Sequence, residues 1–123
     1  MLSSRIAIIE TALETIATVG PGYIDAVNDF PAVAILRPSV QRANIGNAVT
    51  VDSFSFIVRG YTLTDEDSIG ASEALARSIE QCIQSLDSPL IYDARVLSVE
   101  TDEGLLSPYG LCDIVCEVEW ING

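Results

Sequence analysis

The sequence predicts an α+β domain in which two helices pack on one face of a mainly antiparallel four-stranded sheet. The chain has 123 residues, which is enough for one domain spanning residues 1–123 and too few for two. Two segments repeat apolar residues every three or four positions, and four others have the composition of strands. The predicted order is α-β-β-α-β-β, and helices on one face of an antiparallel or mixed sheet are its natural packing.

Residues 3–19 are the first predicted helix. Ser3 or Ser4 is expected to cap its start, and Gly20-Pro21-Gly22 is expected to end it. One apolar stripe runs along the segment, formed by Ile6, Ile9, Leu13 and Ile16.

Two predicted strands follow, joined by a long polar connection. The first covers residues 31–37 and is expected to end at Pro38. Residues 39–48 lack periodicity, so a long loop is predicted there, and long loops often carry contacts. Residues 49–62 alternate, with Phe54, Phe56 and Val58 on one face and Ser53, Ser55 and Arg59 on the other.

The second half of the chain predicts a helix and two more strands. The helix should begin at about Glu66 or Ser68 and end at Leu86, with acids in its first turn. Strands are expected at residues 90–101 and 111–121. In the last strand one face is apolar (Cys112, Ile114, Cys116, Val118, Trp120) and the other acidic (Asp113, Glu117, Glu119). The polar face of the sheet should therefore meet water or a partner.

The charge composition excludes several kinds of chemistry. Acids outnumber bases by 18 to 6, the net charge is −12, and all six bases are arginines. Without histidine or lysine there is no Ser–His or Cys–His pair, imidazole metal ligand, Schiff base or GxxxxGK phosphate loop. We therefore expect no enzyme, catalytic residue, metal site or cofactor. Nucleic-acid binding and anionic membranes are disfavoured because both need clustered cations.

Three short motifs have a chemical interpretation and a structural one. Asp65-Glu66-Asp67 has the carboxylates of a calcium site, but a helix start is favoured because an EF-hand's glycine and final glutamate are missing. Asp102-Glu103 could act with Asp113 or Glu117 as an acid–base pair, but a hairpin turn is favoured. Residues 107–110 predict a turn, since no base is available to activate Ser107.

The cysteines and the N-terminus indicate a reduced compartment. The three cysteines, Cys82, Cys112 and Cys116, are predicted to be buried free thiols without bound metal. No window is long and apolar enough to span a bilayer, and Glu10 and Glu14 interrupt the run that a signal peptide would need. We therefore expect a soluble protein made in a cytoplasm.

Several segments, in order and spacing, resemble a known family. These are residues 56–61 (Phe-Ile-Val-Arg-Gly-Tyr), 64–67 (Thr-Asp-Glu-Asp) and 74–77 (Ala-Leu-Ala-Arg), then 99–104, 108–110 and the final 118–121 (Val-Glu-Trp-Ile). Together they resemble the tail terminators of long-tailed bacteriophages, also described as minor tail or tail-completion proteins. The resemblance covers most of the chain, and residues 21–47 match least.

The resemblance implies a structural virion protein at the head-proximal end of the tail. Such proteins form a six-subunit ring that stops tube polymerisation and joins the tail to the neck or connector. The implied partners are copies of the chain, the tail tube protein and the neck protein. DNA would pass through the lumen without specific binding, because carboxylates repel phosphates.

Two groups of residues are candidates for these contacts. Arg59, Arg77 and Arg95 are predicted to pair with acids at the subunit interface. Arg42, Asn44 and Ile45, in the predicted loop, are predicted to dock on the tube or neck. The alternatives are another neck protein, such as a connector or tube component, or a small ligand-binding regulatory domain.

Overall fold

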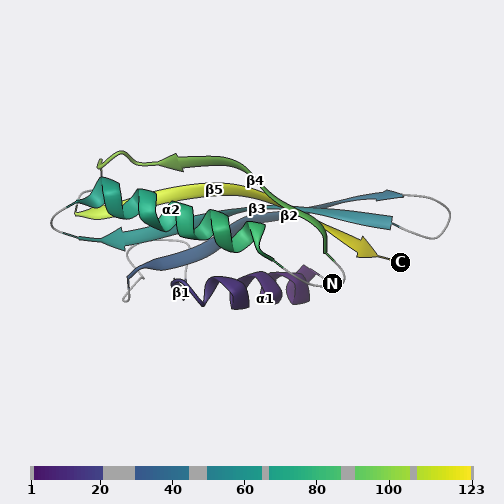
Figure 1. Ribbon diagram of the computed structural model, residues 1–123. Helices are drawn as coiled ribbons and strands as arrows, with labels where there is room; N and C mark the ends of the chain where they lie inside the picture. The colour runs from purple at the N-terminus through teal and green to yellow at the C-terminus, as the bar shows by residue number, and fades with distance from the viewer. Residues whose placement is uncertain are drawn as a thin grey trace.

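The computed structural model describes residues 2–20, 30–44, 50–64, 67–86, 91–105 and 108–122. Two helices and five strands follow one another along the chain (Figure 1). In order they are α1 (Leu2–Leu13), β1 (Thr18–Val19), β2 (Ala32–Asn44), β3 (Thr50–Leu63), α2 (Ser68–Gln84), β4 (Ile91–Thr101) and β5 (Tyr109–Asn122).

The strands form one mixed sheet in the order β1-β2-β3-β5-β4. The pairs β2–β3, β3–β5 and β5–β4 are antiparallel, whereas β1 runs parallel to β2. The prediction of a four-stranded sheet is therefore wrong, because β1 adds a fifth strand. β1 has only two residues, which is too short to show a period-two pattern in sequence.

The extra strand replaces the last part of the predicted first helix. α1 ends at Leu13, where the amide groups of Ile16 and Ala17 both donate to the Leu13 carbonyl and close the helix with a tight turn. The chain then straightens, and the Gly20 amide donates to the Val33 carbonyl of β2. α1 begins at Leu2, so Ser3 and Ser4 lie inside the helix and do not precede it.

β2 is longer than predicted because it continues through Pro38. A register shift between Leu36 and Ser39 marks a bulge, and Arg37 adopts a φ of 51° there. A bulge accommodates a proline, which has no amide to donate to the ladder. Residues 39–44 then pair with residues 55–50 of β3, so the predicted loop over residues 39–48 is wrong for this part. Residues 45–48 lie outside the described residues.

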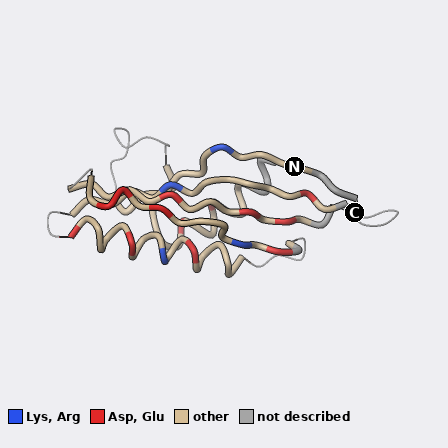
Figure 2. Tube along the Cα trace, turned by 90° about the horizontal axis from the view of Figure 1, so that it is seen from above, with Lys and Arg blue, Asp and Glu red and all other residues tan. Residues whose placement is uncertain are grey.

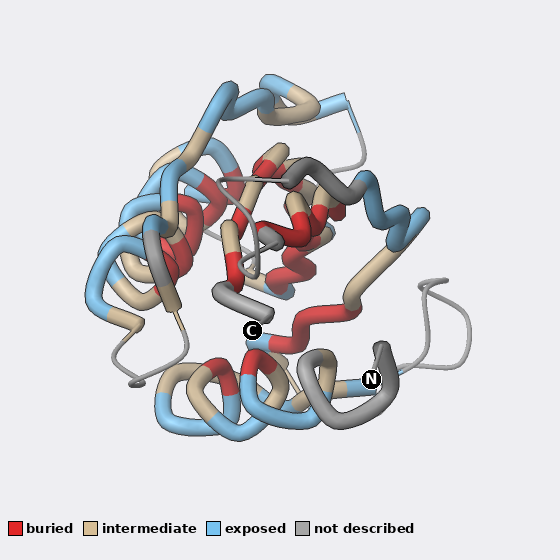
Figure 3. Tube along the Cα trace, turned by 90° about the vertical axis from the view of Figure 1, so that its right-hand side faces the viewer, coloured by how far each residue is buried: buried red, intermediate tan, exposed pale blue. Residues whose placement is uncertain are grey.

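The core lies between the helices and one face of the sheet, where Figure 3 shows the buried positions gathered. The predicted inward face of β5 is confirmed: its five members, from Cys112 to Trp120, are at most 1% exposed. Ile9 and Leu13 of α1 and Ile79 and Ile83 of α2 belong to the same buried cluster. Both helices therefore cover one face of the sheet, as the sequence predicts.

α2 begins as predicted, and it lies close to the sheet. The Asp67 side chain caps it by accepting a hydrogen bond from the Gly70 amide at 2.9 Å. The helix faces Gly60 of β3, where an added Cβ would lie 2.8 Å from both Leu75 Cδ2 and Cys112 Sγ. At Gly110 of β5 there is likewise no space for a side chain. Glycine at these two positions lets the helix backbone approach the strands.

Candidate interaction surfaces

The outer face of the sheet, which the helices leave uncovered, carries a two-pronged ion pair. Arg59 of β3 lies opposite Asp113 of β5 in register. Its Nε and Nη2 atoms donate to the two carboxylate oxygens of Asp113 at 2.7 and 2.8 Å. The hydrogen bond to Asp113 raises the pKa of Arg59 above its ordinary value, and Tyr61 lies close enough to contribute. This fork joins two central strands.

A second arginine on the same face gathers three carboxylates. Arg95 of β4 donates to Asp93 at 3.0 Å and to Glu119 at 2.7 Å, and it also bonds Glu117. The hydrogen bond to Glu117 is the main cause of the raised pKa of Arg95. One guanidinium thus holds together three carboxylates from β4 and β5. The cluster is exposed, so its charges are screened by solvent and salt.

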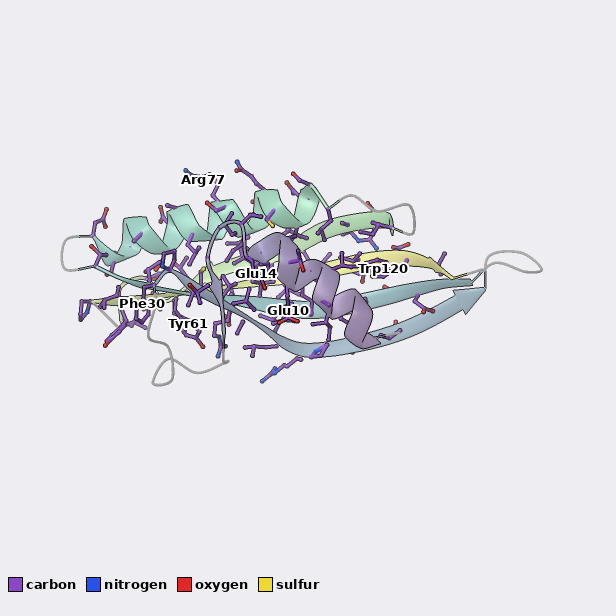
Figure 4. All side chains as sticks on the ribbon, turned by 90° about the horizontal axis from the view of Figure 1, so that it is seen from below. Glu10, Glu14, Phe30, Tyr61, Arg77 and Trp120 are labelled. Carbon is purple, nitrogen blue, oxygen red and sulfur yellow. The ribbon has the colours of Figure 1, made fainter. Side chains whose placement is uncertain are left out.

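The three arginines predicted for the subunit interface differ in whether they already form ion pairs within the chain. Arg59 and Arg95 are ion-paired with acids of their own sheet. Arg77 is exposed on α2 and has no ion pair with any described residue. It lies on the outer side of the helix in Figure 4. Of the three, Arg77 is the one whose charge is not already used within the described chain.

The residues predicted to dock on the tube or neck lie at one end of the sheet. Arg42 and Asn44 are in β2, opposite Asp52 and Thr50 of β3, and do not belong to a loop. Ile45 lies outside the described residues. This end is opposite to the one where α2 begins (Figure 1).

The motifs with competing interpretations have structural roles where they are described. Asp67 is the cap of α2, while Asp65 and Glu66 lie outside the described residues. The Asp102 carboxylate accepts a hydrogen bond from the Leu111 amide at 3.2 Å in the predicted β4–β5 turn. Asp113, its suggested partner in acid–base chemistry, binds Arg59. Ser107 is not described. Within the described ranges, no group of three or more Cys, Asp or Glu side chains is arranged to hold a metal ion.

The cysteines differ in burial. Cys112 and Cys116 are fully buried free thiols, as predicted, and burial raises the pKa of each to about 12. Cys82 is only partly buried, and burial raises its pKa as well. A neutral thiol is a poor nucleophile, so the two buried cysteines are unsuited to covalent chemistry.

Sequence reasoning missed three buried polar side chains in the layer between the helices and the sheet. Asp52 is 1% exposed and occupies an inward position of β3, which the alternation around Phe54 and Phe56 could have indicated. The hydroxyls of Thr62 and Ser72 are also buried, and neither has a hydrogen-bond partner among the residues that the structure describes. They flank Gly110, where an added Cβ would lie within 2.4 Å of both. No sequence signal indicates such a pair.

Comparison with protein families decides what kind of protein this is. The family model of the bacteriophage tail tube terminator protein matches residues 9–122, which is nearly the whole chain. The chain belongs to this family. It is therefore a structural protein of a phage tail, as the resemblance of its sequence segments implies. No curated protein sequence matches the chain.

A solved structure shares the fold of this family member. A chain described as "Virion of native gene transfer agent (GTA) particle" superposes with a TM-score of 0.62 at 14% sequence identity. The match covers 94% of the present chain and 86% of the other. At this identity the likeness concerns the fold alone. In the described part of the present chain, no helix has the length and apolar character needed to cross a bilayer.

Proposed function

We propose that this protein forms a ring at the head-proximal end of the tail tube, stops tube polymerisation and joins the tail to the neck. The observation that carries the proposal is the family match over residues 9–122. The proposal gives the protein a place in the virion, with further copies of itself, the tail tube protein and the neck protein as partners. It assigns no catalytic residue and no cofactor.

The shape of the sheet supports ring formation. Its two edges are different: β4 lies at one edge and β1 with the adjoining part of β2 at the other. A contact between unlike edges of two copies is heterologous, and repeated heterologous contacts close into a ring when the rotation fits. Among the described strands, β1 and β4 each pair on one side only, which leaves their other sides for such contacts.

The charge distribution supports passage of DNA through the ring. The net charge is −12 per chain, and Figure 2 shows acidic positions spread along helices and strands with few basic ones between them. On the outer face, Asp93, Glu100, Asp113, Glu117 and Glu119 outnumber Arg59 and Arg95. A surface with excess carboxylates repels phosphates, so DNA would slide past it without binding.

The oligomer tests the proposal directly. Native mass spectrometry and negative-stain imaging of the purified protein should show closed rings, six-fold if the family resemblance holds. Arg77→Glu should weaken the ring, because a desolvated interface charge is costly to reverse. Gln84→Glu, which adds one negative charge to an exposed position of the same helix, is the control for Arg77→Gln, which makes the same change of −1. Extended tubes would favour a tube component, and a compact dimer would favour a ligand-binding domain; either result would refute the ring.

Docking to the tube or neck is proposed for the end of the sheet where β2 meets β3. Arg42 and Asn44 lie in the last part of β2, and Ile45 follows directly. Replacing residues 45–49 with an Asn-Gly turn tests this role, because a two-residue turn can join paired strands without changing their register. The variant should form rings but leave overlong or headless tails. Normal tails joined to heads would show that this segment does not dock.

A further inference from the structure

A groove containing Arg77 runs along the β4 edge of the molecule. It lies between α2 and β4 and has a volume of about 290 Å³. Its lining combines small or apolar groups with three charged side chains: Glu73, Ala76, Arg77, Glu80, Val99 and Thr101. Val99 is 43% exposed, so part of its apolar surface is available to a partner. We call this the Arg77 groove.

A second groove lies at the other edge. It is formed where α1 leads into β1 and has a volume of about 480 Å³. Its lining surface is mainly polar and comes from one acid and five uncharged residues: Glu14, Ala17, Thr18, Val19, Phe30 and Pro31. Glu14 is exposed and, among the described residues, has no ion pair or side-chain hydrogen bond. We call this the Glu14 groove.

The two grooves lie at the same height along the sheet. Thr101 at the β4 edge pairs with Cys112, and Cys112 pairs with Gly60. Gly60 pairs with Val33, and Val33 pairs with Val19 at the β1 edge. One row across the sheet therefore begins at the Arg77 groove and ends at the Glu14 groove. In a ring whose axis runs along the strands, rotation from one copy to the next does not change a residue's position along that axis. The two grooves would therefore face each other in neighbouring copies.

The charged residues around Arg77 resemble the arrangement around Arg95, in which one arginine binds several carboxylates. On the outer face Arg95 holds three carboxylates together. In the Arg77 groove, Glu73 and Glu80 stand one turn before and after Arg77 on α2. The Glu14 carboxylate of a neighbour would be the third around this guanidinium. Contact between the two surfaces would remove water from around the ion pair and strengthen it.

We propose that the lining residues of the Arg77 groove in one copy meet those of the Glu14 groove in the next copy, with Arg77 bound to the neighbour's Glu14. This inference rests on the proposed ring and names the residues that join its subunits. The occupant is a second copy because the chain itself supplies an acid, Glu14, that is unpaired among the described residues and lies at the same height along the sheet as Arg77. An intrachain contact is excluded by position, since Arg77 lies on the side of α2 away from α1 (Figure 4).

A charge swap tests this contact in the full-length protein. Arg77→Glu leaves Glu14 facing three carboxylates and should raise the protein concentration needed for half-assembly at least tenfold. Adding Glu14→Arg restores one guanidinium among three carboxylates, so the double variant should assemble within about threefold of the wild type. Both side chains are exposed, and circular dichroism checks that each variant folds. Arg77→Gln is a milder second variant, expected to give a smaller loss.

The control separates a specific contact from net charge. Glu103→Arg makes the same charge change as Glu14→Arg, but in the exposed β4–β5 turn, so it should not rescue Arg77→Glu. Native mass spectrometry measures all variants at one ionic strength. If rings form but Arg77→Glu has no effect, or if Glu103→Arg rescues as well as Glu14→Arg, the proposed contact is wrong while the ring stands. If the wild type forms no ring, both proposals are wrong.

Discussion

Gly60→Ala should destabilise the protein because α2 rests directly on this glycine. The added methyl would lie 2.8 Å from Leu75 Cδ2, 2.8 Å from Cys112 Sγ and 3.1 Å from Ile79 Cδ1. Overpacking of this kind costs about 1–3 kcal/mol, and replacing glycine returns about 0.4–1 kcal/mol by restricting the unfolded chain. We expect a net loss of about 1–2 kcal/mol.

The loss converts into a measurable change in melting temperature. An unfolding entropy of about 2.1 cal/mol/K per residue, applied to 123 residues, makes 1 kcal/mol equivalent to about 4 °C. Gly60→Ala should therefore melt about 4–8 °C lower, with a lower urea midpoint and an unchanged m-value. Gly20→Ala is the control, because an added Cβ at Gly20 meets no atom within 4 Å.

A double-mutant cycle identifies the contact responsible. Cys112→Ala removes the sulfur nearest to the new methyl, so it should cost less in the Gly60→Ala background than in the wild type. A favourable coupling of about 0.5–1 kcal/mol is expected for groups in contact. Crowding around Gly60 is refuted if Gly60→Ala is as stable as Gly20→Ala, and crowding by the Cys112 sulfur of β5 is refuted if the two substitutions at 60 and 112 are simply additive.

Three further outcomes are expected. At pH 8 a thiol reagent should label Cys82 well before Cys112 and Cys116, and equal rates would contradict their burial. The pKa of these two thiols is about 12 in the folded state and about 9 in the unfolded state, so the folded state holds their protons more tightly. The stabilisation of the folded state by the neutral thiols is therefore fully present below pH 9. Between pH 9 and 12 urea titrations should show the free energy of unfolding falling by up to about 1.4 kcal/mol per pH unit for each thiol, and a flat profile would contradict this. Asp113→Asn should cost about 1 kcal/mol in the same titrations because it breaks the fork with Arg59, and less in 1 M salt; no loss would show that the pair contributes nothing.

The sequence predicts a helix or strand well where the spacing of its apolar residues and the residues at its ends indicate the same element. α2 lies within the predicted range because Asp67 caps it and its apolar stripe faces the sheet. β5 alternates cleanly, so its inward face is predicted residue by residue. The errors lie where local rules compete with long-range pairing. The bulge at Arg37 and Pro38 keeps β2 in the ladder despite a proline, and β1 exists only because β2 offers it a partner.

The candidate surfaces are less predictable than the fold. Sequence identifies Arg59, Arg77 and Arg95 as the bases near the sheet and second helix, but not which acids they meet. Those acids depend on register: Asp113 opposes Arg59 only because β5 inserts between β3 and β4. The equal height of Thr101 and Val19 likewise depends on four successive strand pairings. Such relations arise between distant segments and leave no local pattern.

The central place of β5 has a consequence for how the chain is made. β5 is synthesised after every other strand, yet it lies between β3 and β4 and supplies Cys112, Ile114, Cys116, Val118 and Trp120 to the core. Until it leaves the ribosome, the nascent chain has two open strand edges and an exposed apolar helix face, a state that pairs readily with other chains. Because the row from Thr101 to Val19 runs through Cys112, its two grooves come into line only when β5 is in place. In the proposed ring, a growing chain would therefore be unable to join its neighbours before its own folding is complete.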